Sequence, residues 1–262
     1  MPGSSLGAAM GVGHRAEDVA LFLLTAGVMT SREANRANLE RALGVLRAGG
    51  LCVLGDDEAH GDLVSGADRI DGTAINFMAQ HGRGLICLAL PPAAVDRLGL
   101  PPMSRGWNDP RCAYTVSIEA RHGITTGISA RERAHTIRVA VDPASGPADL
   151  VVPGHVFPVR ARSGGLLAGG GRAEAALDLV EAAGAGGAAV FTQILDDDGD
   201  LARLSERQTL LGSLGLPVVQ RSELLAFLRA ERVGEGVTAP VDGPPARVWR
   251  AGPAVAGEGA VP

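Results

Sequence analysis

Residues 115–138 read TVSIEARHGITTGISARERAHTIR, and residues 153–165 read PGHVFPVRARSGG. The alternating pattern at 114–119 predicts a strand with one solvent-facing side. Ser129, followed three residues later by Glu132, has the capping-box pattern that predicts the start of a helix. The first stretch therefore indicates a strand, a turn and a capped helix in close succession.

Strand and helix patterns alternate along the rest of the chain. Helices are expected at residues 38–47, 73–80, 92–98, 174–183, 201–214 and 222–229, and strands at 51–54, 85–90 and 188–194. This alternation predicts one α/β domain. We expect an N-terminal extension at 1–36, the α/β domain at 37–232, and a disordered tail at 233–262, because the tail is rich in Gly, Pro, Ala and Val without periodicity.

Composition excludes several classes of function. The chain has 262 residues, 46% of them hydrophobic, and a formal net charge of −5. A nucleic-acid or membrane-surface protein needs a basic face, so neither partner is expected. The apolar run Val19–Met29 follows two acidic residues and is too short to span a bilayer.

All 24 basic residues are arginine, because the sequence contains no lysine. A Schiff-base lysine, a pyridoxal phosphate site and a P-loop lysine are therefore excluded. The three cysteines, Cys52, Cys87 and Cys112, are odd in number and widely spaced. This spacing disfavours a disulfide framework or a structural zinc site, so we expect a reducing cytoplasm.

From Asn38 to Arg229 the chain resembles the 3,4-dihydroxy-2-butanone 4-phosphate synthase family, with the two quoted stretches as the core of the resemblance. That family converts ribulose 5-phosphate into a four-carbon phosphate and formate on the way to riboflavin. The resemblance implies a single-domain α/β fold in which helices surround a mixed sheet. It also implies a homodimer whose pockets take residues from both subunits and bind a small molecule.

The resemblance implies a magnesium ion held by a glutamate of an acidic loop and a histidine of a glycine-rich loop. The acidic loop, D-R-E-N-E-G-D in the family, corresponds to residues 56–62, which keep Glu58 and Asp62. In the glycine-rich loop Arg172 replaces the histidine, and Gly169 and Ala173 replace the arginine and threonine that hold the phosphate. An arginine has no lone pair to donate, so we expect neither metal nor cofactor. We expect Arg172 to pair instead with Glu58, within about 4 Å.

The resemblance also supplies the remaining candidate site residues. The catalytic candidates are Glu58, Asp62, His155 and Arg172, and the substrate-binding candidates are His81, Cys87, Thr125, Thr126, Ser129, Arg133 and Gln193. Gln193 stands where the family has a glutamate. Structural alternatives stay open for several of them: Cys87 as a core residue, Thr125 and Thr126 as a turn, Ser129 as a helix cap, and His155 as a buried structural histidine.

These replacements lead to three functional hypotheses. The first is a repurposed, metal-independent lyase, dehydratase or isomerase of a specialised pathway, acting on a small non-phosphorylated substrate. The second is an authentic synthase of riboflavin biosynthesis that uses magnesium. The third is a non-catalytic binding or scaffold protein. The first is the expectation, because the metal and phosphate residues have changed.

Overall fold

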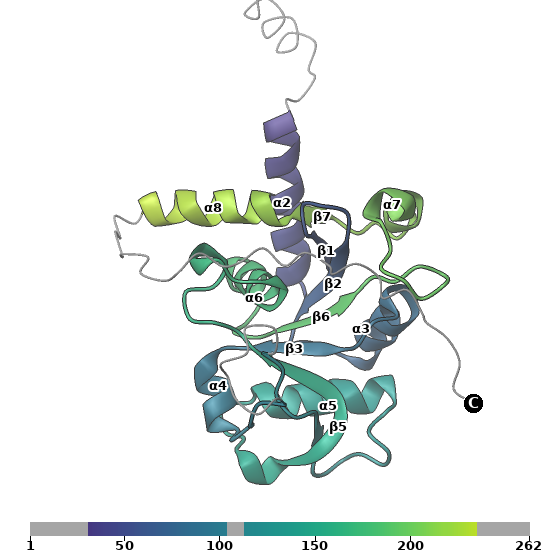
Figure 1. The fold of residues 1–262 in the computed structure, drawn as a ribbon, viewed down its shortest axis with the longest axis vertical. Helices are drawn as coiled ribbons and strands as arrows, with labels where there is room; N and C mark the ends of the chain where they lie inside the picture. The colour runs from purple at the N-terminus through teal and green to yellow at the C-terminus, as the bar shows by residue number, and fades with distance from the viewer. Residues whose placement is uncertain (1–30, 104–112, 235–262) are drawn as a thin grey trace, which may run out of the picture.

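The structure is a computed structural model, and it describes residues 31–103 and 113–234. Figure 1 shows a central sheet with helices on both sides. The helices are α2 (Ser31–Arg47), α3 (Gly72–Phe77), α4 (Pro92–Arg97), α5 (Ala130–Val141), α6 (Arg172–Ala182), α7 (Leu204–Ser213) and α8 (Arg221–Gly234), with short turns η1 (Met78–Gly82), η2 (Pro147–Asp149) and η3 (Leu166–Ala168). The strands are β1 (Cys52–Gly55), β2 (Gly61–Gly66), β3 (Cys87–Leu90), β4 (Ile118–Ala120), β5 (Leu150–Arg160), β6 (Ala189–Gln193) and β7 (Val218–Gln220).

The strands form one sheet in the order β4-β5-β3-β6-β2-β1-β7. The pairs β3–β5 and β1–β7 are parallel, and the other neighbouring pairs are antiparallel. The expected α/β class with a mixed sheet and surrounding helices is therefore confirmed.

The register of the central strands brings distant segments to one edge of the sheet. Cys87 in β3 lies opposite Phe157 in β5 and Phe191 in β6. Asp62 in β2 lies opposite Gln193 in β6. The starts of β2 and β3, the end of β6 and the middle of β5 therefore meet at the same edge, where the candidate residues gather.

Side chains of the central strands alternate between two cores, as the period of two requires. Leu88 and Val190 belong to a core that includes residues of α3 and α5. Cys87 and Phe191, their neighbours in sequence, belong to a second core with residues of α2, α6 and α8. The centre of the sheet is thus buried on both faces, whereas the middle of β5 is exposed at residues 152, 153 and 155.

Short capping interactions set where the helices begin. Asp71 accepts a hydrogen bond from the Ala74 amide at 2.8 Å and starts α3. Ser129 accepts from the Glu132 amide at 3.2 Å and starts α5, as the capping-box pattern predicts. The Glu132 carboxylate also binds the preceding turn, through Thr125 and Gly127.

Three strands carry too weak a sequence pattern to be predicted. All six residues of β2 are buried, so it lacks the alternation that marks a half-exposed strand. Two prolines interrupt β5, and β7 has three residues. The expected helix at 73–80 is α3 followed by the π-helical turn η1.

No helix within the described residues combines the length and apolarity needed to cross a membrane. Helix α2 begins at Ser31, so the proposed boundary between extension and domain at residue 37 falls inside a helix. The proposed tail lies almost wholly outside the described residues, as does Cys112.

Candidate functional site

An ion pair between Asp62 and Arg172 lies at the centre of the candidate site. Asp62 follows the first residue of β2 and is 4% exposed, and Arg172 is the first residue of α6. The Arg172 Nε donates to Asp62 Oδ2 at 2.8 Å, and Nη2 donates to Oδ1. Burial raises the pKa of the Asp62 carboxyl, while the two hydrogen bonds from Arg172 act in the opposite direction. A bidentate arginine satisfies a buried carboxylate in this geometry.

Phe191, Cys87 and Tyr114 lie near this ion pair. The Arg172 Cζ lies 5.7 Å from the centroid of the Phe191 ring, within the range of a cation–π contact. The Cys87 Sγ lies 3.7 Å from the Tyr114 hydroxyl. Burial raises the pKa of the Cys87 thiol to about 11, so the thiol is protonated at neutral pH.

The expected pairing of Arg172 with Glu58 is wrong. Asp62 points to the same face of the sheet as Phe191, beneath the start of α6, whereas Glu58 is exposed in the loop before β2. Glu58 makes no ion pair with the residues that the structure describes. Arg172 stabilises the buried carboxylate of Asp62 more than it would stabilise exposed Glu58, because an unpaired charge is most destabilising in a low-dielectric interior.

The acidic loop that carries Glu58 is a turn organised by Asp56. Its Oδ1 accepts hydrogen bonds from the amides of Glu58, Ala59 and His60 at 2.9–3.0 Å. Burial opposes ionisation of Asp56, but these amides outweigh it, so the pKa of Asp56 lies below its ordinary value. The Asp56 carboxylate is therefore committed to the backbone, which leaves that of Glu58 available.

The glycine-rich loop is fixed by carboxylates of α6. Glu174 accepts from the amides of Gly171 and Arg162, each at 2.7 Å. Gly169 has φ +78°, a left-handed conformation that favours glycine. The Glu174 carboxylate therefore holds the loop through its backbone amides. Gly169 and Ala173 have no side chain that could bind phosphate.

Glu132 organises the Thr125–Ser129 turn. It is buried and accepts from the Thr125 hydroxyl and amide, both at 2.7 Å, and from the Gly127 amide at 3.1 Å. The hydrogen bonds from Thr125 and Ser129 lower the pKa of Glu132 to about 2. Thr125, Thr126 and Ser129 are exposed, so this turn presents hydroxyl groups to solvent on a rigid base.

Three further candidates occupy distinct environments. Gln193 ends β6 opposite Asp62, close to the ion pair. The His81 ring, in η1, packs on Phe77 with a centroid distance of 4.4 Å. The Nε of Arg133 in α5 is buried and has no hydrogen-bond partner among the described residues. Only Gln193 of these three adjoins the Asp62–Arg172 pair through the strand register.

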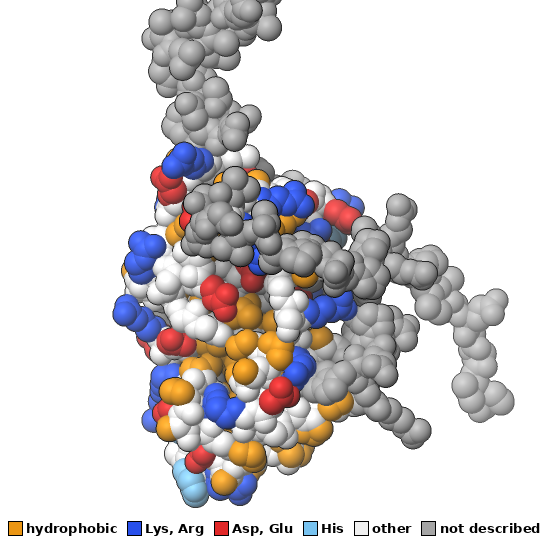
Figure 2. Space-filling model, turned by 90° about the vertical axis from the view of Figure 1, so that its left-hand side faces the viewer, with side chains coloured by type: hydrophobic (Ala, Val, Ile, Leu, Met, Phe, Trp, Pro, Cys, Tyr) orange, Lys and Arg blue, Asp and Glu red, His pale blue; other side chains and the backbone are white. Residues whose placement is uncertain are grey.

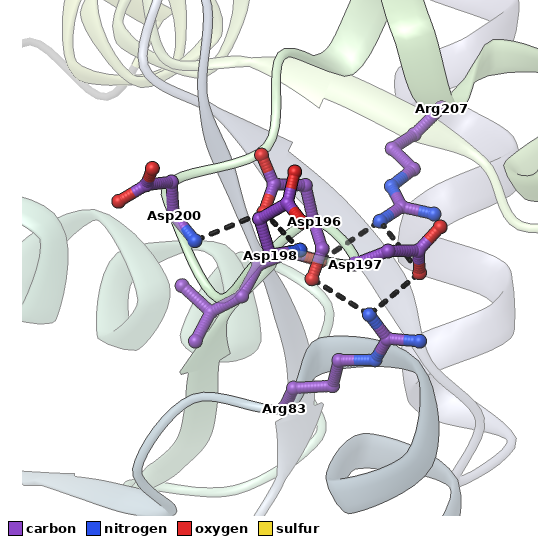
Figure 3. Close-up of polar contacts among 7 residues, drawn as sticks. Arg83, Asp196, Asp197, Asp198, Asp200 and Arg207 are labelled. Carbon is purple, nitrogen blue, oxygen red and sulfur yellow. Dashed lines mark hydrogen bonds and ion pairs between the residues drawn. The ribbon is translucent and has the colours of Figure 1, made fainter.

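The aspartate-rich loop after β6 is held by two arginines, as Figure 3 shows. Arg83 donates to Asp197 Oδ1 at 2.7 Å and to the Asp196 carbonyl at 2.6 Å, and Arg207 reaches Asp197 at 3.4 Å. Asp196 accepts from the amides of Asp198 and Asp200. The carboxylates of Asp196 and Asp197 therefore stabilise the turn. Within residues 31–103 and 113–234, no three His, Cys, Asp or Glu side chains lie close enough together to hold a metal ion.

His155 is half exposed on β5, and its Nδ1 contacts the carboxylate of Glu119 on β4. Because His155 is half exposed, it is not a buried structural histidine. Glu119 was not among the sequence candidates. The alternation at 114–119 predicts a strand but not its partner. Pairing of that strand with the PGHVFP segment is what brings Glu119 next to His155.

Removing Arg172 while Asp62 remains should destabilise the protein. Breaking a buried pair costs roughly 3–5 kcal/mol, and the partial exposure of Arg172 places the expected loss near the lower end. We expect urea denaturation at pH 7 to show this loss for Arg172→Met. The double variant Asp62→Asn/Arg172→Met should recover most of it, because no unpaired charge remains. Arg36→Met, which breaks an exposed pair with Glu40, is the matched control and should change stability by less than about 1 kcal/mol.

Glu132 should make stability fall in acid. Its pKa is lowered from 4.5 to about 2, so its contribution is complete above pH 4.5 and is lost as the pH falls from 4.5 towards 2. Glu132→Gln should therefore be less stable than the wild type at pH 6, and this difference should shrink by pH 3. Denaturant titrations at the two pH values measure it, with exposed Glu206→Gln as the control. An equal difference at both pH values would contradict the assignment.

Comparisons with known proteins place these features in a family. The profile described as 3,4-dihydroxy-2-butanone 4-phosphate synthase matches residues 40–227. The riboflavin biosynthesis protein RibBA of Aquifex aeolicus is 42% identical over 80% of this chain and 53% of its own length. The 3,4-dihydroxy-2-butanone 4-phosphate synthase of Agrobacterium fabrum is 38% identical over 77% of this chain and 96% of its own length. The chain thus spans about half of some relatives and nearly all of others.

A solved 3,4-dihydroxy-2-butanone 4-phosphate synthase in complex with two magnesium ions matches with a TM-score of 0.66 and 34% identity, over 76% of this chain and 98% of the other.

These comparisons correct two expectations. A repurposed enzyme of a specialised pathway is wrong, because relatives about 40% identical carry the synthase name. The expectation of no cofactor is wrong, because a relative of the same fold binds magnesium. The chain belongs to the 3,4-dihydroxy-2-butanone 4-phosphate synthase family.

Proposed function

We propose that this protein is an authentic 3,4-dihydroxy-2-butanone 4-phosphate synthase of riboflavin biosynthesis. It converts ribulose 5-phosphate into the four-carbon phosphate and formate, a reaction that balances without a further reactant. The observation that carries the proposal is the match to the Agrobacterium synthase along 96% of that enzyme's length. Enolisation of the ketose, rearrangement of its skeleton and release of formate all require proton transfers, for which the edge of the sheet offers His155.

Arg172 supports binding of an anionic substrate. Two of its nitrogens are bound to Asp62, but Nη1 has no hydrogen-bond partner within the described part of the chain. The side chain is 38% exposed. We propose that it donates to the substrate phosphate and replaces part of the contact that Gly169 and Ala173 no longer supply.

The donor groups fit a magnesium ion held largely by water and substrate oxygens. Magnesium is commonly bound through one or two carboxylates and keeps several of its waters. Glu58 is the exposed carboxylate of the acidic loop that makes no ion pair within residues 31–103 and 113–234, and Arg172 cannot serve as the second ligand. When bound there, the ion would polarise the carbonyl and hydroxyl oxygens of the sugar.

The decisive experiment measures formate release. Purified protein with ribulose 5-phosphate and MgCl2 should release one formate per four-carbon phosphate, and excess EDTA should abolish the reaction. Glu58→Gln should raise the magnesium concentration for half-maximal rate by at least about tenfold. The exposed variant Glu40→Gln should leave it unchanged. A folded protein that releases no formate at any magnesium concentration would favour a non-catalytic binding protein instead.

We propose that the protein works as a homodimer, as the family resemblance implies. Leu85, Ile128 and Val152 are each more than half exposed, an unusual state for large apolar side chains. They lie in the segment before β3, in the Thr125–Ser129 turn and in β5. On a different face, the left-hand side of the view in Figure 1, Figure 2 also shows hydrophobic side chains that lie between charged ones. Such surfaces are typical of protein interfaces.

The dimer can be tested by light scattering at micromolar concentration, where we expect twice the mass of one chain. Ile128→Glu and Val152→Glu should each weaken association by at least about tenfold, or 1.4 kcal/mol. Leu201→Glu, at another exposed leucine, is the matched control. A monomeric wild type would contradict a site shared between subunits.

The setting that we propose is the cytoplasm. Cys52 and Cys87 are both buried free thiols, which fits a reducing compartment. The proposed partners are a small-molecule substrate and a second copy of this chain, without nucleic acid or membrane.

A further inference from the structure

The acidic loop, residues 56–62, begins beside the start of helix α8. Strands β1 and β7 are parallel, and their last residues, Gly55 and Gln220, pair with each other. The chain continues from Gly55 into the acidic loop and from Gln220 into α8. Because paired parallel strands run in the same direction, the segments that follow them leave the sheet at the same edge. The loop that carries Glu58 and the first turn of α8 are therefore neighbours, although they lie far apart in the sequence.

Asp57 joins these two segments. Its Oδ1 accepts a hydrogen bond from the Ser222 hydroxyl at 2.7 Å and another from the Ser222 amide at 3.0 Å. Its Oδ2 lies 3.6 Å from the Nε of Arg221, the first residue of α8. The amides of a first helical turn have no partner within their own helix, and the helix dipole also favours a negative charge there. Asp57 therefore caps α8 from a distant part of the chain.

The backbone of Asp57 has an uncommon conformation. Its φ is +70°, in the left-handed region that residues other than glycine rarely occupy, although aspartate and asparagine tolerate it better than most. A residue stays in such a conformation where the surrounding structure fixes it. The hydrogen bonds to Ser222 are contacts of this kind, so they hold the loop at the residue directly before Glu58.

The loop is also held on the other side of Glu58. The Ala59 carbonyl accepts a hydrogen bond from the Leu204 amide at 2.7 Å, and His60 Nδ1 lies 3.1 Å from the Ala202 carbonyl. Glu58 itself is exposed. It therefore lies between anchored residues, with α8 on one side and the segment that enters α7 on the other.

We propose that Asp57 is a positioning residue, which caps α8 and thereby holds the acidic loop so that Glu58 is in place before a magnesium ion binds. The inference rests on the proposed function. The family pattern D-R-E-N-E-G-D has arginine at this position, so the cap depends on a residue in which this chain departs from the pattern. An arginine could not accept the hydrogen bonds from Ser222, and it would face the like charge of Arg221.

The proposed role has a distinct kinetic signature. Without the cap, Glu58 would be in position in a smaller fraction of the molecules. When only a fraction of a protein can bind its ligand, the ligand concentration needed rises in inverse proportion to that fraction, while the saturated complex is unchanged. Loss of the cap should therefore raise the magnesium requirement and leave kcat at saturating magnesium unaltered.

Three variants of the full chain test the cap from both sides. Asp57→Gly removes the carboxylate and suits the positive φ, so any loss of order cannot come from backbone strain. Asp57→Asn keeps an acceptor oxygen and the tolerance of this φ but removes the charge. Ser222→Ala removes one donor without changing the loop. Asp198→Gly, at an exposed aspartate of the loop after β6, is the matched control.

The first measurement is hydrogen exchange by mass spectrometry, from milliseconds to minutes, without metal or substrate. Asp57→Gly should speed exchange of the amides of residues 58–60 by about two- to fivefold, the upper value being the whole contribution of a helix cap. Ser222→Ala should have a smaller effect in the same direction, and Asp57→Asn should stay close to the wild type. Unchanged exchange in Asp57→Gly would overturn the proposal.

The second measurement is the magnesium concentration for half-maximal formate release. Asp57→Gly should raise it by about two- to fivefold, with kcat at saturating magnesium and the melting temperature nearly unchanged. Asp57→Asn and Asp198→Gly should leave it close to that of the wild type. Adding Asp57→Gly to Glu58→Gln should raise it no further, because the cap acts through Glu58.

Two results would overturn the positioning role. A lower melting temperature of Asp57→Gly with an unchanged magnesium requirement would show that the cap only stabilises α8. Equal impairment of Asp57→Asn and Asp57→Gly, with Ser222→Ala like the wild type, would show that the charge of Asp57 acts on the ion directly.

The two measurements also separate this inference from the proposed function. A wild type that releases no formate, but whose loop exchange responds to Asp57→Gly, would defeat the synthase reaction and with it the role in magnesium binding. It would leave the cap on α8 standing. An active wild type whose loop exchange and magnesium requirement do not respond to Asp57→Gly would leave the synthase intact and defeat the role of Asp57.

Discussion

The buried carboxylate of Asp62 is the constraint on which the candidate site depends. It lies in a strand enclosed on both faces, where an unpaired charge would be strongly destabilising. Arg172 satisfies it from the first turn of α6, and this pairing joins the sheet to the glycine-rich loop. Because Glu174 fixes the same loop through the amides of Gly171 and Arg162, the ion pair and the loop hold each other in one arrangement.

Periodicity predicted the parts of the fold where one physical requirement dominates. The strand expected at 188–194 and the helix expected at 174–183 correspond closely to β6 and α6, because apolar residues dominate both segments. It failed for β2, since a central strand that includes two glycines and is buried on both faces shows no alternation. It failed for β5 because Pro153 and Pro158 read as breakers, although a bulge accommodates the first of them.

The candidate site was predictable as a set of positions but not as a set of contacts. The resemblance brought Asp62, Arg172 and Gln193 together, and the strand register places them at one edge. The partner of Arg172 was wrong, because the choice between Glu58 and Asp62 depends on which carboxylate is buried. Glu119 was missed for a similar reason: its contact with His155 depends on a register shift between β4 and β5, and a register is set by the whole sheet.

The corrected pairing changes what the acidic loop can do. An arginine bound to Glu58 would have placed a fixed positive charge where a divalent cation would sit. Since Arg172 is committed to Asp62, and Asp56 to three backbone amides, the exposed carboxylate of Glu58 stays accessible to a cation or a substrate. The replacement of a family histidine by arginine therefore removes one ligand without blocking the other, and magnesium chemistry remains compatible with this chain.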